Sequence, residues 1–219
     1  MVTLKVSIVL APVMEAQERI LQKATDLFVR YGIRSVTMDE IAIQLGISKK
    51  TIYQFYADKN ELVNAVIEQY LSHNKDCCDR DRVDAKNAVH ELFLAMQMVQ
   101  DMFENMNVSM LYDLEKYHPK AYQKFEKYKY EFLHKVIREN IERGIEEELY
   151  RDDFDKNIIT AIRLENMLLP FNQALFPKSK YSLVQVQQQL MEHYLFGIAS
   201  IKGHKLILKY KEERNQVKL

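Results

Sequence analysis

A run of cationic, hydroxyl and amide side chains lies between residues 48 and 54. It consists of Ser48, Lys49, Lys50, Thr51, Tyr53 and Gln54. Lysine ammonium groups and hydroxyl groups contact phosphate oxygens, which fixes the position of a protein along a nucleic-acid backbone. Lysine also reaches O6 or N7 of guanine, glutamine pairs with adenine, and the threonine methyl group contacts thymine. The chemistry of this run therefore suits a nucleic-acid contact surface.

Residues 38–56, MDEIAIQLGISKKTIYQFY, supply the elements that would position this run. Gly46 permits a tight turn between two short helices, and Ile52 and Tyr56 can fold back onto the apolar face of the first. That face is formed by Ile41, Ala42 and Leu45. Two short helices joined by a glycine-containing turn describe a helix-turn-helix. The second helix of this motif enters the DNA major groove and contacts base edges mainly through its amino-terminal residues.

Capping residues mark where these short helices start. Thr37 stands three residues before Glu40, which is the pattern of a capping box, and Asp58 repeats the pattern with Glu61. Ser48 can cap the helix between them. The starts lie so close together that each intervening helix spans about two turns.

Lys59 follows the third of these caps and begins the next helix. We expect its ammonium group to join the free N–H groups of that helix start in binding a phosphate. The alternative is an ordinary helical subdomain in which the short helices only pack and the lysines are solvated.

A longer set of residues recurs at fixed spacings between residues 20 and 62. Its members are Ile20, Ala24, Leu27, Phe28, Gly32, Thr37, Ile41, Ala42, Gly46, Ile47, Ser48, Thr51, Ile52, Tyr53, Lys59 and Leu62. With this set the stretch resembles the tetracycline-repressor (TetR) family of transcriptional regulators. The resemblance covers about a fifth of the chain. It implies a DNA-binding domain followed by an all-helical body for sensing and dimerisation.

The resemblance also implies which side chains occupy DNA-contact positions of the family. They are Thr37, Lys49, Lys50, Thr51, Tyr53, Gln54 and Lys59. The sequence departs from the family pattern in two places. Lys50 replaces a residue that is commonly small. In the family, a residue with an aromatic hydroxyl or an imidazole frequently precedes a buried Phe, and Phe55 and Tyr56 invert this order. Phe55 therefore cannot donate a hydrogen bond to phosphate, and Tyr56 must place its hydroxyl at the edge of the core.

The fold class that the sequence predicts is all-α. Few glycines and prolines are present for tight turns, whereas Leu, Glu, Lys, Gln and Met abound. A first helix runs from Glu15 until Gly32 stops it. Longer helices are expected at about 59–80, 84–104, 106–117, 119–144, 155–174 and 182–210. The predicted organisation is a disordered tail or start-site artefact over 1–13, a DNA-binding domain over 14–62, and a helical effector-binding and dimerisation domain over 63–219.

A stripe of soft apolar residues in the body is a candidate effector pocket. The side chains selected for its walls are Phe93, Met96, Met106, Met110, Tyr122, Met167 and Phe171. Methionine is flexible and adapts to varied ligands, so this stripe would suit a small apolar or aromatic effector. Ordinary core packing is the competing interpretation.

Small residues in the last predicted helix are candidates for a dimer interface. They are Gly197, Ala199, Ser200 and Gly203. Glycine inside a helix costs about 1 kcal/mol relative to alanine, and close approach of another helix would compensate this cost. The alternative is simple tolerance of glycine near a helix end. The resemblance favours the dimer, because the last two helices of the family typically form a four-helix interface between subunits.

Composition narrows the function classes. The chain has 31 Lys and Arg residues and 31 Asp and Glu residues, so its formal net charge is zero. No global electrostatic field attracts nucleic acid, and any nucleic-acid surface must therefore be a local one. Adjacent Cys77 and Cys78 suit neither an ordinary disulfide nor a zinc site, which indicates a reducing compartment. No apolar run is long enough for a transmembrane helix. No nucleophile with its base, metal-ligand spacing or phosphate loop occurs, so neither an enzyme, a cofactor nor a metal is expected.

The sequence thus predicts a cytoplasmic, homodimeric repressor. Its partners would be a palindromic double-stranded DNA operator and a small-molecule effector that releases it. The alternative is a member of the same fold that organises DNA or docks a protein partner and has no small-molecule effector.

Overall fold

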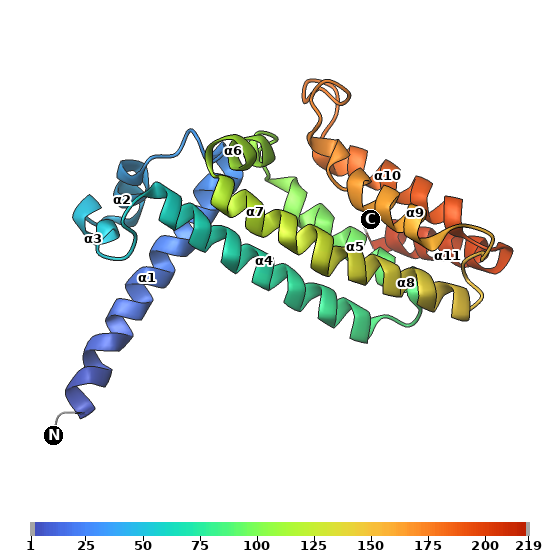
Figure 1. The fold of residues 1–219 in the computed structure, drawn as a ribbon, viewed down its shortest axis with the longest axis horizontal. Helices are drawn as coiled ribbons and strands as arrows, with labels where there is room; N and C mark the ends of the chain where they lie inside the picture. The colour runs from blue at the N-terminus through green and yellow to red at the C-terminus, as the bar shows by residue number, and fades with distance from the viewer. Residues whose placement is uncertain (1–2, 218–219) are drawn as a thin grey trace. The chain divides into compact units, whose positions relative to one another are not determined.

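The computed structural model describes the backbone of residues 3–217 and the side chains of residues 15–214 (Figure 1). All named secondary-structure elements in this range are helices. Within that range the only β-type pairing is an isolated bridge between Tyr150 and Ala199. The all-α fold is therefore confirmed. No helix in the described part of the chain is both long enough and apolar enough to cross a lipid bilayer.

The chain divides into two compact units, which we describe separately. The first unit runs to Leu71 and also contains Met106–Phe125. Its helices are α1 (Thr3–Tyr31), α2 (Met38–Leu45), α3 (Lys49–Tyr53), the first part of α4 (Lys59–Asp84), α6 (Met110–Tyr117) and most of α7 (Pro119–Lys127). The expected boundary at residue 62 therefore differs from the observed division, because α4 continues past it and α6 joins the first unit.

The core of the first unit is built from one face of each helix. On α1, Ile20, Ala24 and Phe28 recur every four residues and are fully buried. Ile41 of α2 and Ile52 of α3 are equally inaccessible. Gly32 ends α1 with a φ of 82°, which suits a residue without a side chain. The capped helices are therefore anchored by buried apolar faces, which leaves their polar faces outward.

The start of α1 differs from the sequence expectation. We expected the first helix to start at Glu15, whereas α1 begins at Thr3 and continues to Tyr31. The disordered tail or start-site artefact over residues 1–13 stays a prediction, because the side chains before residue 15 lie outside the described ones. No glycine occurs before Gly32, but Pro12 lies within this segment and lacks the backbone N–H that a continuous helix would use. Met1 and Val2 lie outside the described residues.

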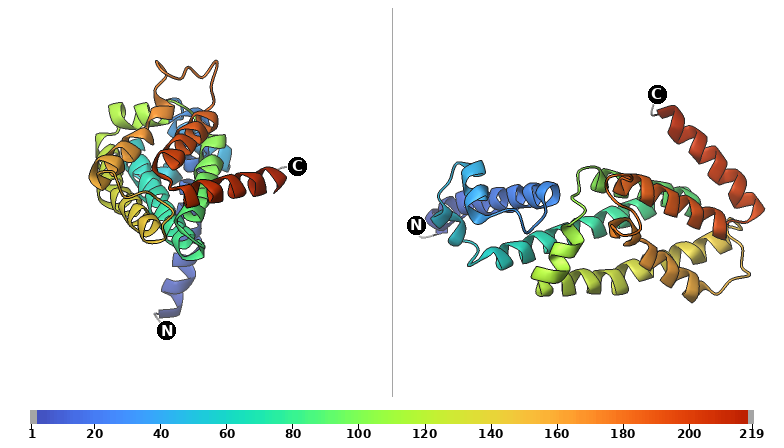
Figure 2. Two further views of the ribbon diagram at one scale, coloured as in Figure 1. Left: turned by 90° about the vertical axis from the view of Figure 1, so that its right-hand side faces the viewer. Right: turned by 90° about the horizontal axis from the view of Figure 1, so that it is seen from above.

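The second unit contains Ser72–Asn105 and the chain from Glu126 onward. It holds the end of α4, α5 (Ala88–Glu104), a π-helical turn η1 (Tyr128–Leu133), α8 (His134–Glu146), α9 (Lys156–Asn166), a 3-10 turn η2 (Leu169–Phe171), α10 (Leu183–Ile198) and α11 (Ile201–Val217). An apolar cluster joins residues of α5, α10 and α11 with Leu149 and Tyr150. In Figure 2, α11 leaves the end of α10 at a clear angle.

Two of the predicted long helices are interrupted. The helix expected over 155–174 ends at Asn166, and Pro170 lies in the 3-10 turn that follows. The helix expected over 182–210 is broken between Ile198 and Ile201. There Ser200 donates its backbone N–H to the Leu149 carbonyl at 3.0 Å. A tertiary partner therefore takes the place of the next helical hydrogen bond.

Candidate nucleic-acid interface

The turn between α2 and α3 is set by the capping residues that the sequence indicates. The Thr37 hydroxyl accepts from the Glu40 N–H at 3.1 Å, and the Glu40 carboxylate accepts from the Thr37 N–H at 2.7 Å. Gly46 closes α2 with a φ of 66°. The Ser48 hydroxyl then accepts from the Thr51 N–H at 3.1 Å and starts α3. Both predicted caps are confirmed.

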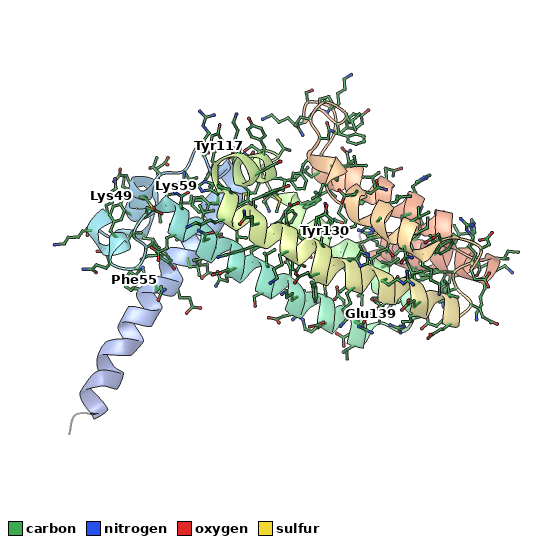
Figure 3. The ribbon with its side chains drawn as sticks, viewed as in Figure 1. Lys49, Phe55, Lys59, Tyr117, Tyr130 and Glu139 are labelled. Atoms are coloured by element: carbon green, nitrogen blue, oxygen red, sulfur yellow. The ribbon has the colours of Figure 1, made fainter. Side chains whose placement is uncertain are left out.

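The outward face of α3 carries most of the residues proposed to contact DNA. Ile52 and Tyr56 are buried and hold the helix against the first unit. The side chains of the opposite face are exposed or, for Thr51, partly exposed: Ser48, Lys49, Lys50, Thr51, Tyr53 and Gln54. Figure 3 shows Lys49 on this short helix and Lys59 at the start of α4. A helix that is apolar inward and cationic outward can approach a polyanion without unfolding.

Lys49 is oriented by a carboxylate that the sequence reasoning did not select. Its ammonium group lies 2.9 Å from an Asp39 carboxylate oxygen and 5.8 Å from the centre of the Tyr53 ring. The hydrogen bond to Asp39 raises the pKa of Lys49. Both members of the pair are exposed, so a phosphate can exchange for Asp39 at small cost. Lys50 is exposed and has no hydrogen bond or ion pair to another described side chain.

Two of the proposed hydroxyl contacts already act as caps. Thr37 is exposed, but its hydroxyl hydrogen-bonds the Glu40 carboxylate at 3.1 Å. The Ser48 and Thr51 hydroxyl oxygens lie 2.9 Å apart. Each hydroxyl retains further lone pairs, and the backbone position is fixed before any ligand arrives. Their role at a phosphate remains a prediction.

Lys59 lies in a different environment from the one we expected. Its ammonium group donates to the Ile33 carbonyl at 2.6 Å and lies 5.8 Å from the centre of the Phe28 ring. Burial lowers the pKa of Lys59, although the Asp113 and Glu40 carboxylates oppose this effect. The structure therefore directs the ammonium group to the loop after α1 instead of leaving it free beside the start of α4.

The start of α4 has a modified version of the expected capping box. The Asp58 carboxylate accepts from the Glu61 N–H at 2.8 Å, as expected. The Glu61 carboxylate accepts instead from the Ala57 N–H at 2.6 Å. Tyr56 is buried, and a hydrogen bond to Gln17 opposes the rise in its pKa that burial causes. Its hydroxyl therefore has a partner inside the first unit.

The helix α6 is part of the surroundings of this interface, which local sequence patterns did not indicate. Buried Asp113 accepts from the backbone N–H of Arg34 at 3.0 Å. A side chain at Gly32 would lie 2.6 Å from the Ser109 hydroxyl oxygen and 3.1 Å from an Asp113 carboxylate oxygen. The turn after α1 is thus held by residues far along the chain, and no short motif encodes such a contact.

The residues selected for an effector pocket do not share one described cavity. Phe93 and Met96 line a small cavity of about 100 Å³ between α5, α10 and α11. Phe171 packs against Phe103 with ring centres 5.2 Å apart, and Met167 follows the end of α9. The remaining three belong to the first unit: Met106, Met110 and Tyr122.

The small residues proposed for a dimer interface have different surroundings. Gly197 is exposed, and a methyl group there would meet nothing within 4 Å in the described structure. At Gly203 a methyl group would lie 1.9 Å from the Leu149 carbonyl oxygen. The Ser200 hydroxyl donates to the Glu148 carbonyl at 2.7 Å, and Ala199 pairs with Tyr150. The close approach at Gly203 is therefore made by the same chain and not by a partner helix.

Comparison with known proteins identifies the region of the chain that carries this interface. Residues 20–66 match the family model described as bacterial regulatory proteins, tetR family. The chain is 30% identical over 109 residues to the uncharacterized HTH-type transcriptional regulator YvaF of Bacillus subtilis, an alignment that spans 48% of this chain and 55% of YvaF. The chain thus spans about half the length of this curated relative.

Two solved structures show the same fold over most of the chain. A TetR-family transcriptional regulator from Agrobacterium tumefaciens has a TM-score of 0.72 at 15% identity and covers 86% of this chain and 100% of its own. The transcriptional regulator FadR of Bacillus subtilis, in complex with stearoyl-CoA, has a TM-score of 0.64 at 16% identity and covers 83% of this chain and 98% of its own. At these identities the similarity concerns the fold alone.

Proposed function

Because residues 20–66 match the tetR family of bacterial regulatory proteins, we propose that the chain is a homodimeric regulator of this family that binds a specific DNA operator through α3. The observation that carries this proposal is the division of α3 into a buried anchor, Ile52, and an exposed face that contains Lys49, Lys50 and Gln54. This face presents cations for phosphates and an amide for adenine.

A palindromic operator follows from the dimer. One recognition helix reads only a few base pairs, and twofold symmetry doubles the sequence that is read. On α11, Ile201 and Leu208 are exposed and lie seven residues apart, so they share one helix face. An apolar face of this kind supports the proposal that the last helices pair between subunits.

Selection of bound sequences from a random DNA pool tests the DNA-binding proposal. We expect an inverted repeat, and we expect Lys49→Ala combined with Lys50→Ala to reduce affinity for the selected site. The salt dependence of binding should flatten by up to about two units, one for each lost phosphate contact. A selected site without inverted symmetry, or a double variant that binds like the wild type, would contradict the proposal.

We further propose that the regulator is a repressor that a small apolar or aromatic effector releases from DNA. The second unit supports this with the apolar walls of Phe93 and Met96 and with the edge-on pair of Phe103 and Phe171. The stearoyl-CoA in the FadR structure gives an example of a small molecule bound by a protein of this fold. Release of the selected DNA by an added compound is the direct measurement.

One observation favours a second candidate, a DNA-organising or protein-docking member of the fold that has no effector. The cavity lined by Phe93 and Met96 measures about 100 Å³, whereas ligand pockets typically measure roughly 300–1,000 Å³. A panel of apolar compounds that neither raises the melting temperature nor releases DNA would favour this candidate.

A further inference from the structure

The helix α9 places a positive charge in the interior of the second unit. Arg163 is 5% exposed, and its Nη1 atom is fully enclosed without a hydrogen-bond partner. No ion pair or hydrogen bond joins this guanidinium group to any side chain or carbonyl among residues 15–214. Arginine is charged at every physiological pH, and buried charges in proteins are nearly always paired. This group therefore lacks a counter-ion that its surroundings require.

The nearest acidic residue on α9 is engaged elsewhere. Glu165 lies 2.9 Å from the buried Lys129 ammonium group, and the Tyr130 hydroxyl donates to it at 3.1 Å. Asp155 caps the start of α9 through the Asn157 and Ile158 N–H groups. Both carboxylates thus have partners of their own, and neither neutralises the guanidinium group.

The described contact of the Arg163 guanidinium group is an aromatic ring. Its guanidinium carbon lies 5.4 Å from the centre of the Tyr194 ring on α10. Thr160 and Leu164, its neighbours on α9, are buried. Tyr194 belongs to the main apolar cluster of the second unit. A ring face partly compensates a cation but supplies neither hydrogen bonds nor a full negative charge.

A second interior polar group also lacks a partner. Gln187 is buried on α10, and its side-chain oxygen has no hydrogen-bond donor within the described structure. It precedes Tyr194 by seven residues, so the two side chains project from the same face of α10. The interior thus contains an unpaired cation and an unpaired acceptor. A carboxylate supplies the acceptor and negative charge that Arg163 lacks, whereas the Gln187 oxygen needs a donor that a carboxylate does not have.

We propose that the effector of this regulator carries a carboxylate, which pairs with Arg163 inside the second unit, and an apolar body. A carboxylate matches the planar fork of one guanidinium group and balances its single charge, whereas phosphate groups favour clusters of cations. Met167 follows Arg163 by one helical turn and Phe171 lies in the next turn, so apolar walls for the body are close along the chain. This inference rests on the proposed function and specifies the class of its effector.

The test compares organic acids with their uncharged esters on the full-length protein. Hexanoate, decanoate and phenylacetate are each titrated beside the corresponding methyl ester, with calorimetry and the melting temperature as readouts. We expect at least one acid to bind and raise the melting temperature, and its ester to bind at least about 30-fold more weakly. Failure of all three acids to bind, or equal binding of acid and ester, overturns the proposal.

Variants of Arg163 connect the effect to this residue. Without ligand, Arg163→Met should raise the melting temperature by about 2–4 °C or more, because it removes an unpaired interior charge and retains an apolar stem. The same variant should lose acid binding. A lower melting temperature without ligand would show that the fold already satisfies the guanidinium group and would overturn the proposal. Arg163→Lys retains the charge without the bidentate fork and should weaken acid binding about tenfold.

A matched arginine and a separate DNA assay complete the design. Arg138 of α8 is partly exposed and donates to Glu142 at 2.6 Å, so Arg138→Met should leave acid binding unchanged. Affinity for the selected operator, measured without any acid, should be the same in the wild type and in Arg163→Met. If the wild type does not bind DNA, the proposed function is refuted. If the wild type binds DNA but does not bind an acid more tightly than its ester, only the effector class is refuted.

Discussion

At the scale of single residues, the two lysines that start α3 have unequal surroundings. Lys49 is paired with Asp39, whereas Lys50 has no described partner. Asp39 both competes for the Lys49 ammonium group and brings a negative charge to the face that would meet DNA. Asp39→Asn should therefore tighten DNA binding by up to about fivefold, as measured by fluorescence anisotropy.

The control for this variant removes a charge from the same unit at another place. Asp26 is exposed on α1, and Asp26→Asn changes the net charge equally without touching Lys49. If both variants tighten binding to the same degree, the effect comes from net charge and not from release of Lys49.

Lys59 leads to a prediction about stability. Its ammonium group donates to the Ile33 carbonyl, so Lys59→Met removes a charge-assisted hydrogen bond that fixes the loop after α1. The variant should lower the free energy of unfolding by about 1 kcal/mol, as measured by urea denaturation. Unchanged stability together with a salt slope reduced by one unit would show that Lys59 contacts phosphate after all.

The pH dependence of the first unit should contain a contribution from His118. Burial, and next the charge of Lys59, hold the pKa of His118 below its ordinary value of 6.5, although Asp113 and Asp58 oppose the shift. The unfolded chain therefore binds a proton more readily than the folded one, and stability is lost as pH falls through about 6.5. Urea unfolding at pH 7.5 and 5.5 should show a smaller loss in His118→Gln, whose amide can still hydrogen-bond Asn60.

At the scale of elements, local chemistry made the first unit predictable. The starts of α2 and α3 follow from Thr37 with Glu40 and from Ser48, because a cap involves atoms only a few residues apart. The break between α10 and α11 could not be predicted in this way. It depends on Ser200 meeting the Glu148 and Leu149 carbonyls, which lie about fifty residues earlier in the chain. The position of Lys59 at the Ile33 carbonyl is a tertiary contact of the same kind.

The two glycines near that break provide a prediction about packing. Gly203→Ala would force a methyl group against the Leu149 carbonyl oxygen and should cost about 1–3 kcal/mol in urea unfolding. Gly197→Ala meets nothing in the chain and should be neutral or stabilising by up to about 1 kcal/mol. Sedimentation analysis of both variants measures their oligomeric state. A Gly197→Ala protein that folds normally but is monomeric would show that a partner subunit approaches closely at this position.

At the scale of the whole molecule, regulation requires the two units to be energetically coupled. The helix α4 contributes residues to both of them, since Leu71 ends one segment of the first unit and Ser72 begins the second. A ligand shifts DNA affinity only as far as it binds the DNA-competent and DNA-incompetent states with different affinities. Tight effector binding alone would release nothing.

The coupling must be reciprocal, which provides the last prediction. If a carboxylate effector weakens operator binding by a given factor, saturating operator must weaken effector binding by the same factor. Calorimetric titration of the acid into free protein and into the protein–operator complex should therefore give dissociation constants whose ratio equals the ratio of operator affinities with and without the acid. An acid that binds Arg163 with the same affinity in both titrations cannot be an inducer, however tightly it binds. That result would make the second unit a binding site without control over DNA and would favour the DNA-organising or protein-docking alternative.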